Sequence, residues 1–179
     1  MNTIDHFSLS RRTALKVGLC AGAFLSTAGL AASLTGCSAS APAADFEVLR
    51  DSDLPFLRAL IPVLLEGSLG AVSVQNAVAD TLKNIDASLS GLSPGVLKLT
   101  QQLFDVLALP VTRGPLTGIW GRWDNASSEH IRIFLNRWDS SSLGILRMGH
   151  NALLQLVMMA WYGRAESWAH CGYSGPPTV

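Results

Sequence analysis

The spacing of apolar residues is the feature that most constrains the fold of this chain. Beyond residue 50 they recur every three or four positions, in segments separated by stretches rich in Gly, Ser and Pro. One such segment holds Phe56, Leu57, Leu60, Ile61, Leu64 and Leu65. This period places apolar side chains on one face of an α-helix, and the alternation typical of strands is not seen. The sequence therefore predicts an all-α fold.

The periodic segments predict a single small domain of five or six helices. We expect helices over about residues 54–66, 72–89, 94–109, 124–138 and 142–162. Asp53 and its neighbours are predicted to cap the first helix, and Pro62 predicts a kink or a helix in two pieces. Residues 110–118 hold two prolines and two glycines, so we expect a loop there, followed by a short helix over 119–123.

The start of the chain is interpreted as an export signal, separate from the fold. Two adjacent arginines precede about twenty small or apolar residues, the pattern read by the twin-arginine export machinery. The residues of this pattern are Ser10, Arg11, Arg12, Leu15 and Lys16. Because that machinery moves folded proteins, the signal indicates a protein that is assembled before export.

The end of the apolar run indicates how the signal is removed. Leu34-Thr35-Gly36-Cys37 resembles a lipobox, so we expect cleavage before Cys37 and a lipid on that cysteine. The alternative is cleavage after Ala41-Pro42-Ala43, which would release a soluble periplasmic product. An uncleaved membrane span is disfavoured, because residues 17–36 are rich in Gly, Ala, Ser and Thr although their length suits a bilayer.

These features divide the chain into a signal over residues 1–36, a flexible tether over 37–46 and a helical domain over 47–179. We expect the domain to end in an extended Gly/Pro-rich tail and to stand in the periplasm, held to a membrane by the lipid.

The domain's charges argue against a nucleic-acid partner. The 13 basic and 13 acidic side chains of the whole chain fall to 10 and 12 without the signal, and the cations are scattered singly.

Several motifs of enzyme and cofactor sites are missing from the sequence. It has no Cys-x-x-Cys-His haem attachment, no glycine-rich phosphate loop after a strand, and no His-Glu-x-x-His pattern. His130, His150 and His170 lie about twenty residues apart, whereas metal ligands on one helix lie three or four apart. We interpret His150, on an apolar stripe, as a core or interface residue. The prediction is a chain without catalytic residues, metal or cofactor.

Cys171 is the thiol that remains beyond the signal and the lipidated position. An odd cysteine in an oxidising compartment is either a buried, inert thiol or one half of a bond to another chain. Both interpretations stay open from the sequence.

The aromatic residues are gathered near the end of the chain. All five tryptophans and both tyrosines lie in its last third, and these residue types are favoured at protein interfaces. We interpret Trp138 and Trp161 as core residues. Trp168 and Tyr173 stand in a Gly/Pro-rich tail, so they must pack on the chain's own helices or on another subunit.

The last twenty residues resemble the gluconate 2-dehydrogenase subunit 3 family. Trp161-Tyr162-Gly163, then Trp168, then the run Gly172-Tyr173-Ser174-Gly175-Pro176-Pro177 are similar to the family's aromatic pair, tryptophan and Gly-Tyr-Pro-Gly-Pro ending. The twin-arginine leader and a helix ending in Arg137-Trp138 also fit. Ser174 departs from the pattern, because the family usually has proline there.

This resemblance implies an accessory subunit without a cofactor of its own. It would bind a flavin dehydrogenase of the glucose–methanol–choline type, which carries the FAD, and lend that partner its export signal; a cytochrome c is a further candidate partner. The residues expected to contact the partner are Trp161, Tyr162, Trp168, Cys171, Gly172, Tyr173, Gly175 and Pro176. The alternative is a stand-alone envelope lipoprotein with a binding or structural role.

Overall fold

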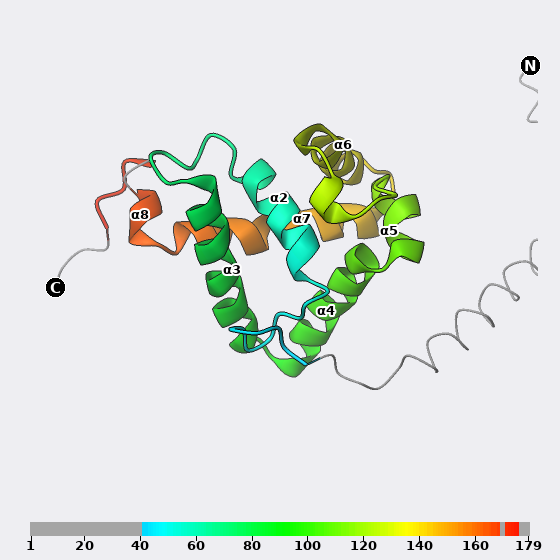
Figure 1. Cartoon of the computed structure of the whole chain (residues 1–179), viewed down its shortest axis with the longest axis horizontal. Coiled ribbons are helices and arrows are strands. Elements are labelled where there is room, and N and C mark those ends of the chain that lie inside the picture. Colours follow the sequence, from blue (N-terminus) through cyan, green and yellow to red (C-terminus); the bar gives the residue numbers. More distant parts are fainter. Residues whose placement is uncertain (1–40, 169–170, 176–179) are drawn as a thin grey trace, which may run out of the picture. The chain divides into compact units, whose positions relative to one another are not determined.

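The computed structural model describes residues 41–168 and 171–175, and this part of the chain is all-α (Figure 1). Pro42–Val179 group into one compact unit. The only β-structure among the described residues is an isolated antiparallel bridge between Pro42 and Arg50. The elements in chain order are α2 (Leu54–Leu64), α3 (Val74–Ser90), α4 (Pro94–Ala108), α5 (Pro110–Thr117), the 3-10 helix η1 (Trp123–Asn125), α6 (Ser128–Asp139), α7 (Gly144–Tyr162) and α8 (Ala165–Trp168).

Helix α2 forms the centre of the domain because apolar side chains point outward from most of its circumference. It contacts α3, α4, α6, α7 and η1, and Figure 1 shows it between α3 and the α4–α6 side of the fold. Its fully buried side chains are Phe56, Leu57, Leu60 and Ile61. Burial of one such side chain contributes about 1.5–3 kcal/mol, so α2 supplies a large part of the core.

A row of aromatic rings connects four elements through the core. Phe104 of α4 meets Phe56 of α2 with ring centroids 5.2 Å apart, and Phe56 meets Trp123 of η1 at 6.1 Å. The row continues to Phe134 at 6.1 Å and to Trp138 at 4.9 Å, both in α6. Edge-to-face pairs of this kind are favoured by the ring quadrupoles. The row fixes how α4, α2, η1 and α6 pack together.

Two buried indoles in this row also satisfy carbonyl groups near helix ends. Trp123 Nε1 donates to the Leu107 carbonyl at 2.9 Å, and Trp138 Nε1 donates to the Leu116 carbonyl at 2.9 Å. The last carbonyls of a helix lack partners within the helix. The two tryptophans therefore help to end α4 and α5 as well as to fill the core, which agrees with the interpretation of Trp138 as a core residue.

Most of the predicted helices are confirmed within two residues at each end. Ser73 caps α3, with its side chain accepting from the Asn76 N–H at 3.3 Å, and Ser127 caps α6 through the His130 N–H at 3.2 Å. Helix α2 is one continuous helix that includes Pro62 near its end, so the alternative of two pieces is wrong. A proline near the C-terminal end interrupts little, because few residues follow it in the helix.

The predicted loop over residues 110–118 is wrong, because Pro110–Thr117 form α5. Pro110 occupies the first turn, where a missing N–H is tolerated, and Pro115 lies close to the end of the helix. Gly118 closes α5 with φ 80°, a left-handed conformation that favours glycine, and donates its N–H to the Gly114 carbonyl at 2.8 Å. The same prolines and glycines that indicated a loop thus serve as the start and stop of a short helix.

Two further predictions near turns need correction. The short helix expected over 119–123 lies further along the chain, as η1. Asp53 does stand at the N-cap of α2, but its side chain makes no capping bond. Its carboxylate is used by Arg50 instead, as described below.

Candidate functional site

The residues predicted to direct export and lipidation lie outside the part of the chain that the structure describes. These are Ser10, Arg11, Arg12, Leu15, Lys16 and Cys37, and Pro176 of the predicted contact set also lies outside it. What the structure does describe is the domain that follows them and the tail up to Gly175.

Trp161 is a core residue, and its prediction as a direct partner contact is wrong. Its side chain is 1% exposed, because it faces inward from the last turns of α7. The neighbouring Ala160 carbonyl accepts from Asn84 Nδ2 of α3 at 3.0 Å. Tyr162, one residue on, is exposed, with its hydroxyl 3.4 Å from Ser68 Oγ.

The described part of the tail folds back on α8. The Trp168 and Tyr173 rings meet edge to face, with centroids 5.3 Å apart. Trp168 Nε1 donates to the Tyr162 carbonyl at 2.9 Å, and the Tyr173 N–H donates to the Trp168 carbonyl at 3.0 Å. Gly172 and Gly175 have φ of 70° and 100°, which supplies the tight turns that favour glycine. Trp168 thus packs on the chain itself, while Tyr173 keeps about half of its surface exposed.

Cys171 is an exposed free thiol. The interpretation as a buried, inert cysteine is therefore wrong for this chain. Its Sγ lies 3.2 Å from the Trp168 carbonyl, beside the tail turn. The bond to another chain stays a prediction.

Residues 42–53, which we call the leading segment, are held against the domain rather than free. Ala43 is buried, and its N–H donates to the Leu49 carbonyl at 2.7 Å. The tether predicted to reach residue 46 therefore gives way to packed structure by residue 42. This segment is where the chain enters the helical domain from the residues predicted to form the export signal.

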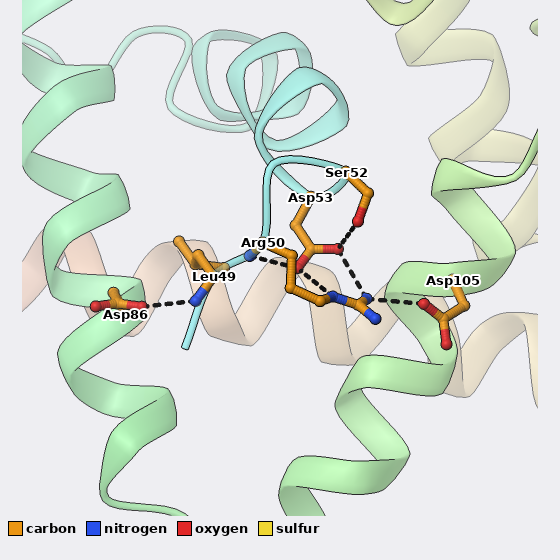
Figure 2. Close-up of polar contacts among 6 residues, drawn as sticks. All are labelled: Leu49, Arg50, Ser52, Asp53, Asp86 and Asp105. Atoms are coloured by element: carbon orange, nitrogen blue, oxygen red, sulfur yellow. Dashed lines mark hydrogen bonds and ion pairs between the residues drawn. The ribbon is translucent and has the colours of Figure 1, made fainter. Parts of the chain in front are cut away.

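A single carboxylate on α3 holds the leading segment in place. Asp86 is 6% exposed and accepts three backbone N–H groups, from Glu47 at 2.7 Å, Val48 at 2.9 Å and Leu49 at 2.8 Å. Figure 2 shows the Asp86 carboxylate facing the backbone of Leu49. Hydrogen bonds to an ionised acceptor contribute more than neutral ones. The three together satisfy a charge that would otherwise be costly to bury.

Arg50 ties the other end of the leading segment to α4. Its guanidinium donates to Asp53 through Nε and Nη2, both at 2.9 Å, and Nη2 lies 2.8 Å from Asp105 of α4 (Figure 2). The hydrogen bond to Asp53 is the main reason why the pKa of Arg50 is raised. A cation whose pKa is raised in the folded state stabilises the fold at every pH below its unfolded-state pKa. This stabilisation is lost only as the pH rises through the folded-state pKa. The titration of Arg50 therefore leaves stability unchanged near neutral pH.

An exposed apolar row runs along α7, and we call it the α7 stripe. Its members, Ile145, Met148, Ala152 and Met159, recur at helical spacing on one face. Ile145, Met148 and Met159 are 71%, 67% and 74% exposed. The side chains that α7 buries are Leu153, Val157, Ala160 and Trp161. The sequence indicated the apolar stripe that carries His150 on this helix, and it missed the exposed α7 stripe.

The α7 stripe borders an apolar pocket between α7 and α4. The pocket has a volume of about 180 Å³, and its walls are Leu89, Leu92, Leu99, Thr100, Leu103, Phe104, Ala152, Leu153 and Leu156. Ala152 belongs both to the stripe and to the pocket wall. Leu99 of α4 is also exposed. Single exposed apolar residues are normal on a protein surface, but a row that continues into a pocket indicates a binding surface.

Searches of the described residues for metal and membrane features were negative. No group of three or more His, Cys, Asp or Glu side chains in the described part could hold a metal ion. Within the same residues, no helix is long and apolar enough to cross a membrane. His150 lies half-buried in α7, with Nδ1 3.5 Å from Asp139 Oδ1, an arrangement that fits an interhelical contact.

Comparisons of the chain with protein-family models, with curated proteins and with solved structures found no match. The resemblance of the tail to the dehydrogenase small subunits therefore rests on the sequence motifs alone. The site's geometry defines an all-α domain with an anchored leading segment and one long exposed apolar stripe.

Proposed function

We propose that this chain is a non-catalytic accessory subunit that escorts a flavin-dependent dehydrogenase of the glucose–methanol–choline type. It supplies the partner with a twin-arginine signal at Arg11 and Arg12 and with a lipid anchor at Cys37. The partner carries the FAD and performs the oxidation in the periplasm. A cytochrome c is the further subunit that would accept the electrons.

The observation that carries this proposal is the α7 stripe. Three large apolar side chains on one helical row each leave more than two thirds of their surface in water. Covering them would remove apolar area from water, which is favourable at roughly 25 cal/mol per Å² before the costs of association. Methionine adapts its shape to a partner and is enriched at interfaces. A protein partner on α7 accounts for a row that the chain itself leaves open.

The leading segment also supports the proposal. An escort must connect its signal firmly to the folded part that holds the partner. Asp86 on α3 and Asp105 on α4 both bind this segment, so the chain between signal and core is fixed at two helices. The tail adds exposed Tyr173 and Cys171 to the surface available for contact.

The experiment that tests this proposal is a gentle affinity purification of the full chain from membranes of the native host. The eluate is examined by a visible absorption spectrum and by identification of the co-purifying chains. The proposal expects a flavin spectrum together with one large flavoprotein. Recovery of the chain alone, without flavin absorbance, contradicts it and favours the stand-alone envelope lipoprotein.

A further inference from the structure

A pocket that the proposed function does not use lies beside the leading segment. It has a volume of about 280 Å³ and lies among the leading segment, the start of α2, the α4–α5 corner and η1. Its walls are Ser52, Pro55, Ala108, Pro110, Arg113, Arg122, Trp123 and Asp124. Two of these side chains are arginines and only one is an acid.

Arg113 of α5 is the unusual member of this wall. Its residue is 9% exposed, and its Nε is buried without a hydrogen-bond partner. No ion pair or hydrogen bond of its guanidinium is found among the described residues. A buried charge without a partner is costly, because water no longer solvates it. A nine-tenths buried arginine on the wall of an open pocket, with its Nε unpartnered, therefore calls for an acceptor that enters the pocket.

The acid on the pocket wall does not supply that acceptor. Asp124 Oδ2 lies 3.0 Å from Arg122 Nη2, and both side chains are largely exposed. This pair leaves the charge of Arg113 unbalanced. Pro110, the first residue of the eight-residue helix α5, also lines the pocket, so the positive end of the helix dipole lies there as well.

We propose that this pocket binds a small oxyanion, a phosphate or a carboxylate, held by Arg113 with Arg122 at the rim. The planar fork of a guanidinium matches two oxygens of either group. The volume is several times the roughly 30 Å³ that one water occupies, which leaves room for a small anion and a few waters. This site is independent of the partner proposed above.

Nuclear magnetic resonance of the full, ¹⁵N-labelled chain tests the site with defined probes. The Trp123 indole N–H serves as the reporter, because its ring lines the pocket and its N–H donates to Leu107. The Trp138 indole is the internal reference, since it is not part of the pocket wall. Inorganic phosphate and succinate are titrated separately, with sodium chloride at matched ionic strength as the blank. We expect a saturable shift of the Trp123 signal with at least one oxyanion, and the stronger of the two identifies the preferred group.

Variants distinguish binding at a specific site from the general attraction of anions to surface cations. Arg113→Gln should weaken oxyanion binding by about tenfold or more, because it removes a charge-assisted fork. Arg122→Gln should weaken it less, and Lys98→Gln, on the exposed face of α4, should leave it unchanged. If Arg113→Gln loses the dispersed Trp138 signal and hence its fold, Arg113→Lys and Arg122→Gln decide the question. Two results would overturn the proposal. One is a Trp123 shift with phosphate and succinate that is no larger than the shift with chloride. The other is an oxyanion affinity that is unchanged in both Arg113→Lys and Arg122→Gln.

Discussion

At the scale of single residues, the packing of Trp138 depends on the absence of a side chain at Gly149. An added Cβ at Gly149 would lie 2.7 Å from Cζ3 and 3.2 Å from Cε3 of Trp138. The indole has no room to move, because it is 1% exposed and hydrogen-bonded to Leu116. Gly149 thus lets α7 pack directly on the Trp138 ring of α6 at the end of the aromatic row.

We predict that Gly149→Ala destabilises the domain although alanine favours helix. The propensity gain is about 1 kcal/mol, and overpacking against a fixed ring costs about 1–3 kcal/mol. Chemical denaturation should show a lower midpoint with the slope unchanged. Gly95→Ala is the matched control, because nothing lies within 4 Å of its added Cβ in α4, and it should be neutral or stabilising. A Gly149→Ala protein as stable as the Gly95→Ala protein would show that Trp138 is not held as described.

Cys171 carries a second prediction at this scale. Its thiol is exposed beside the tail turn, and we predict that it forms a disulfide with another chain. A non-reducing gel of the complex purified from the periplasm should show a heavier band that disappears with reductant and in Cys171→Ser. If the wild-type band is monomeric under non-reducing conditions, the thiol is free and the intersubunit disulfide is abandoned.

At the scale of elements, the leading segment depends on Asp86 of α3. We predict that Asp86→Asn destabilises the domain by about 1–3 kcal/mol. The amide has one acceptor oxygen where the carboxylate serves three N–H groups, so at least one buried donor loses its partner. Denaturation measures the stability, and limited proteolysis should show faster cleavage within residues 42–49. Asp51→Asn is the control, because it removes a charge from an exposed residue of the same segment that has no described contact. An equal loss of stability in the two variants would contradict the role of Asp86.

The helices could be predicted from the sequence because apolar periodicity and capping residues act locally. Ser73 and Ser127 cap α3 and α6, and Pro94 opens α4, so all three helices begin within four residues of the expected starts. Helix α5 was missed because proline and glycine are read as breakers, while position decides whether they break or cap a helix. Local pattern thus fixes where most elements lie but not how Pro110 and Gly118 are used.

The candidate site was less predictable, because burial depends on contacts between distant segments. Asp86 and Arg50 gave no signal in the sequence, since their partners lie 37 and 55 positions away in Leu49 and Asp105. The α7 stripe had a signal that was overlooked: apolar residues cover more of α7 than one buried face needs. Trp161 was interpreted as a core residue from the sequence, whereas the family resemblance placed it among the partner contacts; its 1% exposure agrees with the first interpretation.

The α7 stripe provides a further prediction for the element that meets the partner. Met148→Glu with Met159→Glu should reduce recovery of the flavoprotein in the affinity purification by about tenfold or more, because carboxylates would have to lose water in an apolar contact. Both residues are largely exposed, so the fold should keep its stability. Gln75→Glu with Asn76→Glu, at exposed positions in the first turn of α3, is the matched control. Unchanged recovery of the flavoprotein with the methionine variant would show that the partner does not bind at the α7 stripe.

At the scale of the whole molecule, the proposal joins two regions with different tasks. In this proposal, the predicted signal carries the export address, and the helical domain offers a surface for a second protein. The leading segment lies between them, bound by α3 and α4. Interpreted together, these regions describe one chain whose signal serves two proteins.

The export of the partner is the most direct test of this account. Replacing Arg11 and Arg12 by lysines keeps the charge of the signal but removes the arginine pair that the translocon reads. Cell fractionation should then find both this chain and the co-purifying flavoprotein in the cytoplasm, whereas the wild-type strain exports both. A flavoprotein that still reaches the periplasm in the twin-lysine strain would contradict the account.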